Sequence, residues 1–177
     1  CRYKMLPNGE RAILALLLPG DFCDLHVAIL DRMDHSIGTL VDSEIARLSR
    51  AETEEMLETH PSIRRACRWA TLVDEAVLRE WLVNVGRRPT ALQLAHLFCE
   101  LYMRLQAVGL TRDHHFTMPF TQATLGDLIG ITPVHVQRKM AELQREGWIA
   151  LQDRMIQFPD FEELARYADF DPRYLHL

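Results

Sequence analysis

The chain has 177 residues, of which 48 % are hydrophobic and 25 % are charged, as in an ordinary globular protein. This length fits one large domain or two small ones, and the composition excludes collagen-like, disordered and low-complexity classes. The longest apolar stretch, residues 12–18, is far shorter than the ~20 residues that span a bilayer, so we expect no membrane span. The net charge is −5, so a nucleic-acid partner must be argued from local charge.

The four cysteines are widely spaced and form no CxxC pair, which favours reduced thiols and a cytoplasmic protein over a disulfide scaffold or a zinc ribbon. The opening residues lack the apolar run of a signal peptide. Because the chain does not open on methionine, we expect a further segment before Cys1.

The first fifty residues alternate between apolar stretches and turn residues. This pattern predicts strands at residues 2–6, 12–18, 36–41 and 44–48. Four short strands fit part of a sheet sandwich or roll, but they are too few to close one.

Helical signals begin at Ser49, where a capping-box pattern predicts a short helix that ends before Pro61. Residues 62–85 contain no proline or glycine and predict a long amphipathic helix. The apolar residues of this helix form a narrow stripe with a spacing close to seven residues, which predicts that the helix packs against the same helix of a second copy. The alternative is an ordinary helix that packs on the sheet of its own chain. The seam residues are Ile63, Cys67, Ala70, Val73, Val77 and Trp81.

The stretch Gly86-Arg87-Arg88-Pro89 is predicted to break this helix and to act as a hinge between domains. A buried core helix is expected next, ending at Gly109. The predicted organisation is therefore a strand-containing first domain at residues 1–60, a long helix at 61–86 that pairs with a second copy, and a second domain at 87–177.

Residues 116–158 give the most consistent local signals. Thr121 as N-cap and Gly130 as C-terminal stop predict a helix of about two turns. Thr132 as N-cap and Pro133 at the first helical position predict a second helix almost immediately afterwards. A β-hairpin then follows, so the segment is predicted to be a winged helix-turn-helix.

The second helix of such a unit enters the DNA major groove. Arg138 can bind guanine O6 and N7, Gln137 can pair with adenine, and Val134 can contact a thymine methyl group. Thr132 lies at the helix start, where a phosphate is favoured, and Lys139 adds local positive charge. Val136, Met140 and Leu143 are predicted to face inward.

The same pattern also fits a helical hairpin in a globular core, or a ligand-sensing or protein-interaction module whose winged helix does not bind DNA. An enzyme is the weakest interpretation, because no nucleophile–base pair, phosphate loop or pair of acids stands in a recognisable frame.

These motifs resemble the Crp/Fnr family of bacterial transcription regulators, most specifically over residues 120–138 and on to Leu143 and Gly147-Trp148-Ile149. The resemblance covers essentially the whole chain. It implies an α+β fold with a partial β-roll of the cyclic-nucleotide-binding jelly-roll type, a long dimerisation helix and a C-terminal winged helix-turn-helix domain. The implied protein is a cytoplasmic homodimer that binds a palindromic operator and contacts RNA polymerase.

Carried over by position, the resemblance makes Arg138 the central base-reading residue, with Gln137 and Val134 beside it. Many family members have an acidic residue that contacts the DNA groove at the position of Val134. We therefore expect this protein to prefer different bases from those members. Thr132 matches the phosphate-contacting position, and Gln122 is a second backbone contact.

The residues at the expected effector-binding site differ from those of the family. Its cyclic-nucleotide cassette carries an arginine for the cyclic phosphate, but no arginine lies beside Ser36, and Asp34 would repel a phosphate. The sequence therefore argues against cyclic AMP and leaves the effector open. Cys23, His26 and His35 offer thiolate and imidazole ligands, but such residues are common without a metal, so no metal or other cofactor is expected.

Overall fold

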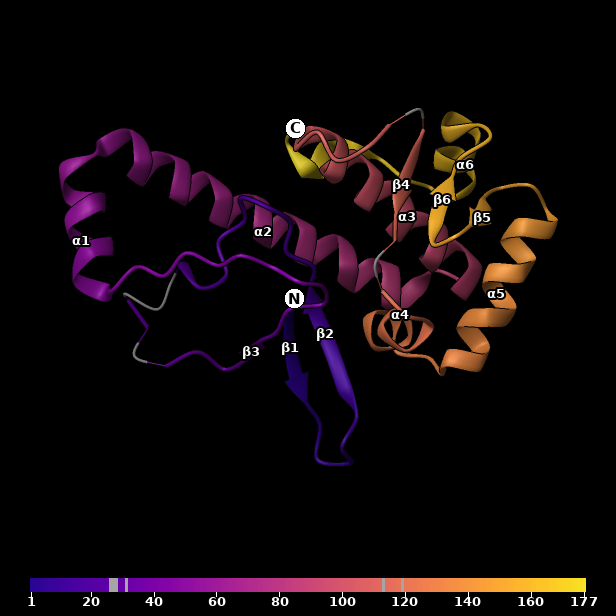
Figure 1. Cartoon of the computed structure of the whole chain (residues 1–177), viewed down its shortest axis with the longest axis horizontal. Helices are drawn as coiled ribbons and strands as arrows, with labels where there is room; N and C mark the ends of the chain where they lie inside the picture. The colour runs from indigo at the N-terminus through magenta and orange to yellow at the C-terminus, as the bar shows by residue number, and fades with distance from the viewer. Residues whose placement is uncertain (26–28, 31, 113, 119) are drawn as a thin grey trace. The chain divides into compact units, whose positions relative to one another are not determined.

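The computed structural model describes residues 1–25, 29–30, 32–112, 114–118 and 120–177. The chain divides into two compact units, Cys1–Leu78 and Arg79–Leu177. The N-terminal unit contains β1 (Arg2–Met5), β2 (Arg11–Ala15), β3 (Ser36–Ile37), α1 (Arg50–Thr59) and most of α2 (Pro61–Arg87), as Figure 1 shows.

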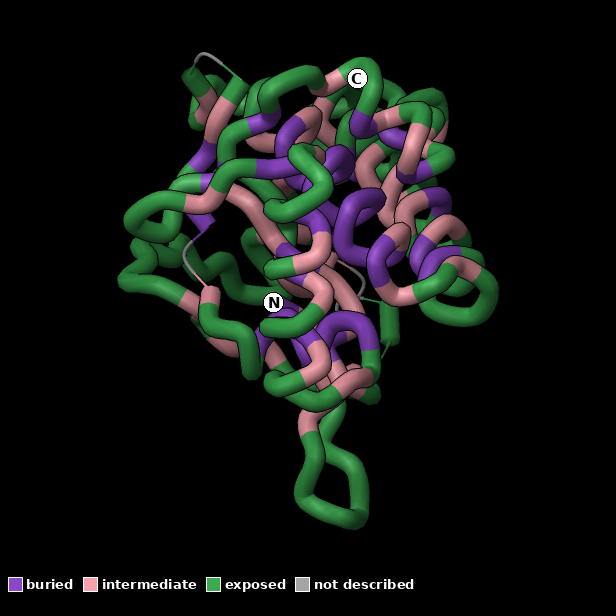
Figure 2. Tube along the Cα trace, turned by 90° about the vertical axis from the view of Figure 1, so that its right-hand side faces the viewer, coloured by how far each residue is buried: buried purple, intermediate pink, exposed green. Residues whose placement is uncertain are grey.

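In the N-terminal unit β1 is the central strand of an antiparallel sheet with the order β2-β1-β3. Tyr3 pairs with Ile13 on one side and with Ser36 on the other. The turn between β1 and β2, residues 6–10, is exposed throughout (Figure 2). Ile13 and Leu16 are buried and form part of the core of this unit.

The predicted strands are confirmed in place for β1, β2 and β3, although β2 and β3 are shorter than expected. The strand predicted at residues 44–48 is wrong, because this described stretch is irregular. Ile45 and Leu48 are 53 % and 56 % exposed, so their spacing reflects no buried sheet face.

Helix α1 begins as predicted. The Glu52 amide donates to Ser49 Oγ at 3.2 Å, and the Ser49 amide donates to Glu52 Oε2 at 2.7 Å. This reciprocal pair is a complete capping box and fixes the start of the helix.

The break after α2 lies at the end of the stretch that was predicted to interrupt the helix. Gly86 is inside the helix, which continues to Arg87, and α3 begins at Thr90. The break is at Arg88-Pro89, because proline disfavours helical geometry in the residue before it. The helix break therefore lies in the second half of the predicted stretch, and the hinge itself stays a prediction.

The C-terminal unit holds the last turns of α2, then α3 (Thr90–Ala107), β4 (His115–Thr117), α4 (Gln122–Ile129), α5 (Pro133–Arg145), β5 (Ala150–Gln152), β6 (Met155–Gln157), α6 (Phe161–Tyr167) and the 3-10 helix η2 (Pro172–Leu175). Helix α3 is its core: residues 93–102 are all buried, and α3 contacts α5, α6, β4 and η2. The predicted buried core helix is thus confirmed.

Candidate nucleic-acid interface

Two helices meet in a tight corner at residues 121–133. Thr121 Oγ1 accepts a hydrogen bond from the Thr124 amide at 3.2 Å, which caps α4. Gly130 ends α4 in a left-handed conformation with φ 72°. Thr132 Oγ1 then accepts from the His135 amide at 3.3 Å, which caps α5. The predicted starts of both helices and the predicted stop of α4 are confirmed.

Gly126 lets the two helices approach this closely. A Cβ added to Gly126 would lie less than 3.0 Å from the Ile131 carbonyl oxygen. The Gly126 carbonyl accepts from the amides of Gly130, at 2.8 Å, and Ile131, at 3.1 Å. Gly126 was not among the residues predicted from the sequence. Its signal was a glycine inside a short helix, where glycine is otherwise unfavourable.

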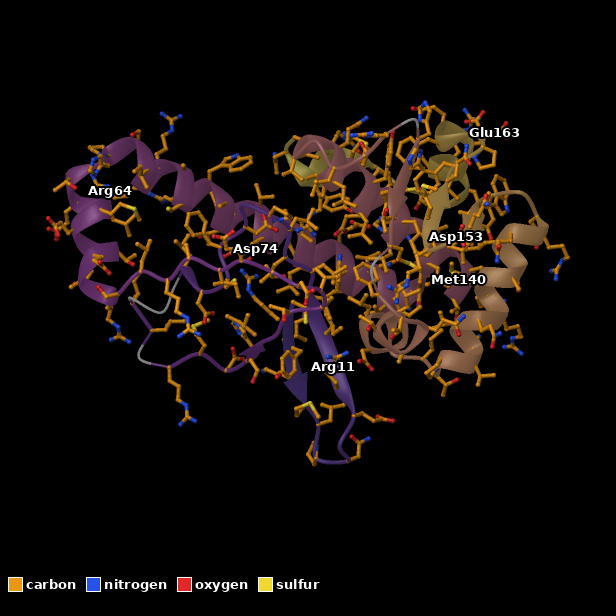
Figure 3. All side chains as sticks on the ribbon, in the orientation of Figure 1. Arg11, Arg64, Asp74, Met140, Asp153 and Glu163 are labelled. Carbon is orange, nitrogen blue, oxygen red and sulfur yellow. The ribbon has the colours of Figure 1, made fainter. Side chains whose placement is uncertain are left out.

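Helix α5 has the two faces that its sequence predicts. Val136 and Leu143 are fully buried and Met140 is 3 % exposed, so this side packs into the unit (Figure 3). Val134 is 76 % exposed, which is unusual for an apolar side chain of its size.

Gln137 and Arg138 are also exposed, one turn along from Val134. The structure therefore brings the three predicted base-reading residues onto the solvent side of α5.

The predicted backbone-contacting residues are distributed between the two helices. Thr132 and Gln122 are exposed near the N-terminal ends of α5 and α4 respectively. Lys139 is half-buried, and its Nζ donates to Glu142 Oε2 at 2.7 Å. This bond holds the pKa of Glu142 below its usual range, so Glu142 stays ionised and offsets the charge of Lys139.

The hairpin after α5 is the predicted wing. Strands β4, β6 and β5 form an antiparallel sheet in that order, with Leu151 opposite Ile156. Asp153 and Arg154 turn the hairpin with φ of 48° and 67°, the left-handed pair that a two-residue hairpin turn requires. Arg154 is exposed at the tip, a placement that the sequence analysis did not single out.

A Crp-like helix-turn-helix domain matches residues 93–167, which include α4, α5 and the wing. A probable transcriptional activator of Rhizobium leguminosarum bv. viciae is 27 % identical over 92 % of this chain and 67 % of its own length. The transcriptional activator protein FnrL of Cereibacter sphaeroides is 27 % identical over 95 % of this chain and 68 % of its own.

Residues 93–167 therefore form a Crp-like helix-turn-helix domain, and over most of its length the chain is similar to transcription regulators of the Crp/Fnr family. This is a family of transcription regulators that bind DNA through the helix-turn-helix, not of enzymes, and the finding favours DNA binding over the protein-interaction module. The chain spans about two thirds of the length of these Crp/Fnr relatives.

Solved structures share the Crp/Fnr fold. A CRP-family transcriptional regulator of Thermus thermophilus aligns with a TM-score of 0.72 at 19 % identity, covering 95 % of this chain and 82 % of that one. FixK2 of Bradyrhizobium japonicum aligns with a TM-score of 0.66 at 18 % identity, covering 93 % and 80 %.

The six residues of the predicted α2 seam differ in how far the single chain buries them. Cys67 is 4 % exposed and Trp81 is 8 % exposed in the single chain, so both are already packed within it. Ile63, Ala70, Val73 and Val77 are half-buried. The seam with a second copy stays a prediction, and Cys67 and Trp81 have the least exposed surface of its six residues in the single chain.

On the effector side, His35 Nε2 lies 3.1 Å from Asp24 Oδ1 and its Nδ1 lies 3.4 Å from Asp34 Oδ1. Cys23 is a free thiol, and His26 lies outside the described residues. Within the described part of the chain, no three histidine, cysteine or acidic side chains gather as metal ligands would. Nor does any described helix combine the length and apolarity that a membrane span needs.

Proposed function

We propose that this Crp/Fnr protein acts as a homodimer that binds a palindromic operator, with α5 of each copy in the major groove. The observation that carries the proposal is the exposed face of α5, where Val134, Gln137 and Arg138 project from the first turns of a helix whose other side is buried. The N-terminal residues of a recognition helix are the ones that reach base edges.

The chemistry of this face predicts what it reads. Arg138 donates two bonds to guanine, and Gln137 both donates to and accepts from adenine. Val134 has no polar atom, so it can contact only a thymine methyl group. Thr132, Gln122 and Lys139 are the proposed backbone contacts, with Arg154 added from the tip of the wing.

For the dimer we propose a face of α2 that the sequence analysis did not choose. Trp69, Leu72 and Val83 are 51 %, 55 % and 47 % exposed. Trp69 and Val83 are two heptads apart and Leu72 follows Trp69 by three positions, so all three share one side of the helix. Burial of this apolar stripe would stabilise a two-helix seam.

We further propose that the N-terminal unit senses a signal, with residues 1–60, 61–86 and 87–177 acting as sensor, dimerisation helix and DNA-binding domain. The Lys4 ammonium and His35 hold the pKa of Asp34 below its usual range, so Asp34 is ionised. An anion beside Ser36 opposes a cyclic phosphate, which argues against cyclic AMP. Binding to operator DNA implies action in the cytoplasm, with RNA polymerase as the proposed partner.

Selection from a random DNA library, followed by sequencing, tests the proposal. We expect the wild-type protein to enrich a palindrome and Arg138→Ala to weaken binding to it by about tenfold to a hundredfold, with relaxed preference at one base pair. Arg166→Ala is the matched control, because the Arg166 side chain is 72 % exposed and belongs to α6 rather than to α5. No enriched palindrome, or one indifferent to Arg138→Ala, would contradict the proposal.

A further inference from the structure

A carboxylate lies in the centre of the C-terminal unit. Glu100, in the middle of α3, is 0 % exposed. An ionised carboxylate in such a place is strongly destabilising unless it is fully hydrogen-bonded. The hydrogen-bond partners of Glu100 therefore indicate its structural role.

Three donors from three elements surround Glu100. Trp81 Nε1, on the last turns of α2, donates to Oε2 at 2.9 Å and to Oε1 at 3.1 Å. The Tyr174 hydroxyl, on η2, donates to Oε2 at 2.8 Å. Arg104 Nη1, one turn along α3, donates to Oε1 at 3.2 Å. Glu100 thus joins α2 to the C-terminal 3-10 helix through α3.

A second set of bonds ties the same elements together. Arg88 Nη2 donates to Glu80 Oε1 at 2.8 Å and to the Asp169 carbonyl at 3.3 Å. Asn84 Nδ2, on α2, donates to the Gln93 carbonyl of α3 at 3.2 Å. Each of these hydrogen bonds has one partner on α2 or directly after it, so several bonds attach the last turns of α2 to the rest of the C-terminal unit.

These bonds do not touch the proposed DNA-contacting side chains. They hold the last turns of α2 against α3 and the C-terminal segment, and so help to fix the direction of these turns within the C-terminal unit. In a dimer joined through α2, that direction decides how far apart two recognition helices stand. Because successive half-sites face the same side of DNA only once per helical turn of about 10 base pairs, a small change in direction changes the spacing that fits.

We propose that Glu100, bonded to Trp81 and Tyr174, is a positioning residue that sets the half-site spacing this protein accepts. The proposal rests on the proposed function, since it requires a dimer on a palindrome. It assigns a role in operator specificity to the C-terminal segment, which lies far along the chain from α5.

The test compares operators that differ only in spacing. The palindrome selected by the wild type is measured beside versions with one base pair added or removed at its centre, together with a single half-site. We expect Tyr174→Phe and Glu100→Gln to reduce the ratio between correct and altered spacing by about threefold to tenfold, which matches the net contribution of a typical intramolecular hydrogen bond. Affinity for the single half-site should not change.

Tyr167→Phe is the matched control, because Tyr167 belongs to the same C-terminal region but stacks on Trp148, with ring centroids 4.3 Å apart. It should leave the spacing ratio as in the wild type. Tyr174→Phe keeps the half-buried aromatic ring, so it tests the proposal even if Glu100→Gln fails to fold. If the wild type selects a palindrome but the spacing ratio is unchanged in both variants, the positioning role of Glu100 is wrong and the proposed function stands. If the wild type selects no palindrome, the proposed function is wrong as well.

Discussion

Gly126 and Gly86 both lie in helices, yet a side chain would have opposite consequences at the two positions. Gly126 faces the Ile131 carbonyl at the corner between α4 and α5, whereas a Cβ at Gly86 would meet nothing within 4 Å. Neither glycine needs a left-handed backbone. The difference therefore comes from packing alone.

Gly126→Ala should destabilise the C-terminal unit by about 1–3 kcal/mol, because the Ile131 backbone must move to admit a methyl group. Gly86→Ala is the paired variant and should stabilise by about 0.5–1 kcal/mol through helix propensity. Urea unfolding followed by circular dichroism measures both. Equal stability in the two variants would show that the corner has room for a side chain.

At the scale of elements, α2 presents apolar residues on more than one side. Trp69, Leu72 and Val83 form the stripe proposed as the dimer seam, and Leu78 is 50 % exposed elsewhere on the helix. Periodicity predicted an amphipathic helix correctly. It could not say which apolar side the chain itself would cover.

Leu72→Glu should weaken dimerisation at least about tenfold, because it places two charges in an apolar seam. Leu78→Glu is the matched control: it adds the same charge at a similarly exposed position off the stripe and should leave the dimer intact. Sedimentation velocity over a range of concentrations distinguishes them. If Leu78→Glu dissociates the dimer and Leu72→Glu does not, the seam lies on another side of α2.

At the scale of the whole molecule, a buried histidine links stability to pH. His96 is 1 % exposed, and burial together with Arg88 lowers its pKa to about 3. Glu80 Oε1 lies 3.2 Å from Nε2. Neither ring nitrogen has a hydrogen-bond partner among the described residues, and burial together with the Arg88 charge outweighs the attraction of Glu80 for a protonated ring.

His96 therefore contributes stability above its unfolded pKa of about 6.5 that is lost as the pH falls towards 3, because only the unfolded chain takes up the proton. One proton makes the unfolding equilibrium constant rise by up to about tenfold per pH unit in that window. His96→Phe should remove this part of the acid sensitivity when thermal unfolding is measured between pH 7 and pH 4.

His176→Phe, at an exposed position near the C-terminus, is the matched control and should keep the wild-type pH dependence. A wild type and His96→Phe with parallel stability profiles would show that His96 is protonated in the folded protein.

The sequence by itself determined the features that depend on neighbouring residues. The caps at Ser49, Thr121 and Thr132, the stop at Gly130 and the two faces of α5 all follow from local hydrogen bonding and helical periodicity. These features also carried the resemblance to the Crp/Fnr family. They were sufficient for the helix-turn-helix and for the exposed base-reading candidates.

Only the tertiary structure decided the features that join distant positions. Trp81, Glu100 and Tyr174 meet in one cluster although they are far apart in sequence, and no local pattern marks them as partners. Cys67 is buried by its own chain, which the heptad pattern could not distinguish from burial by a second copy. The physical reason is that burial depends on which surfaces meet, whereas periodicity records only that one side of a helix is apolar.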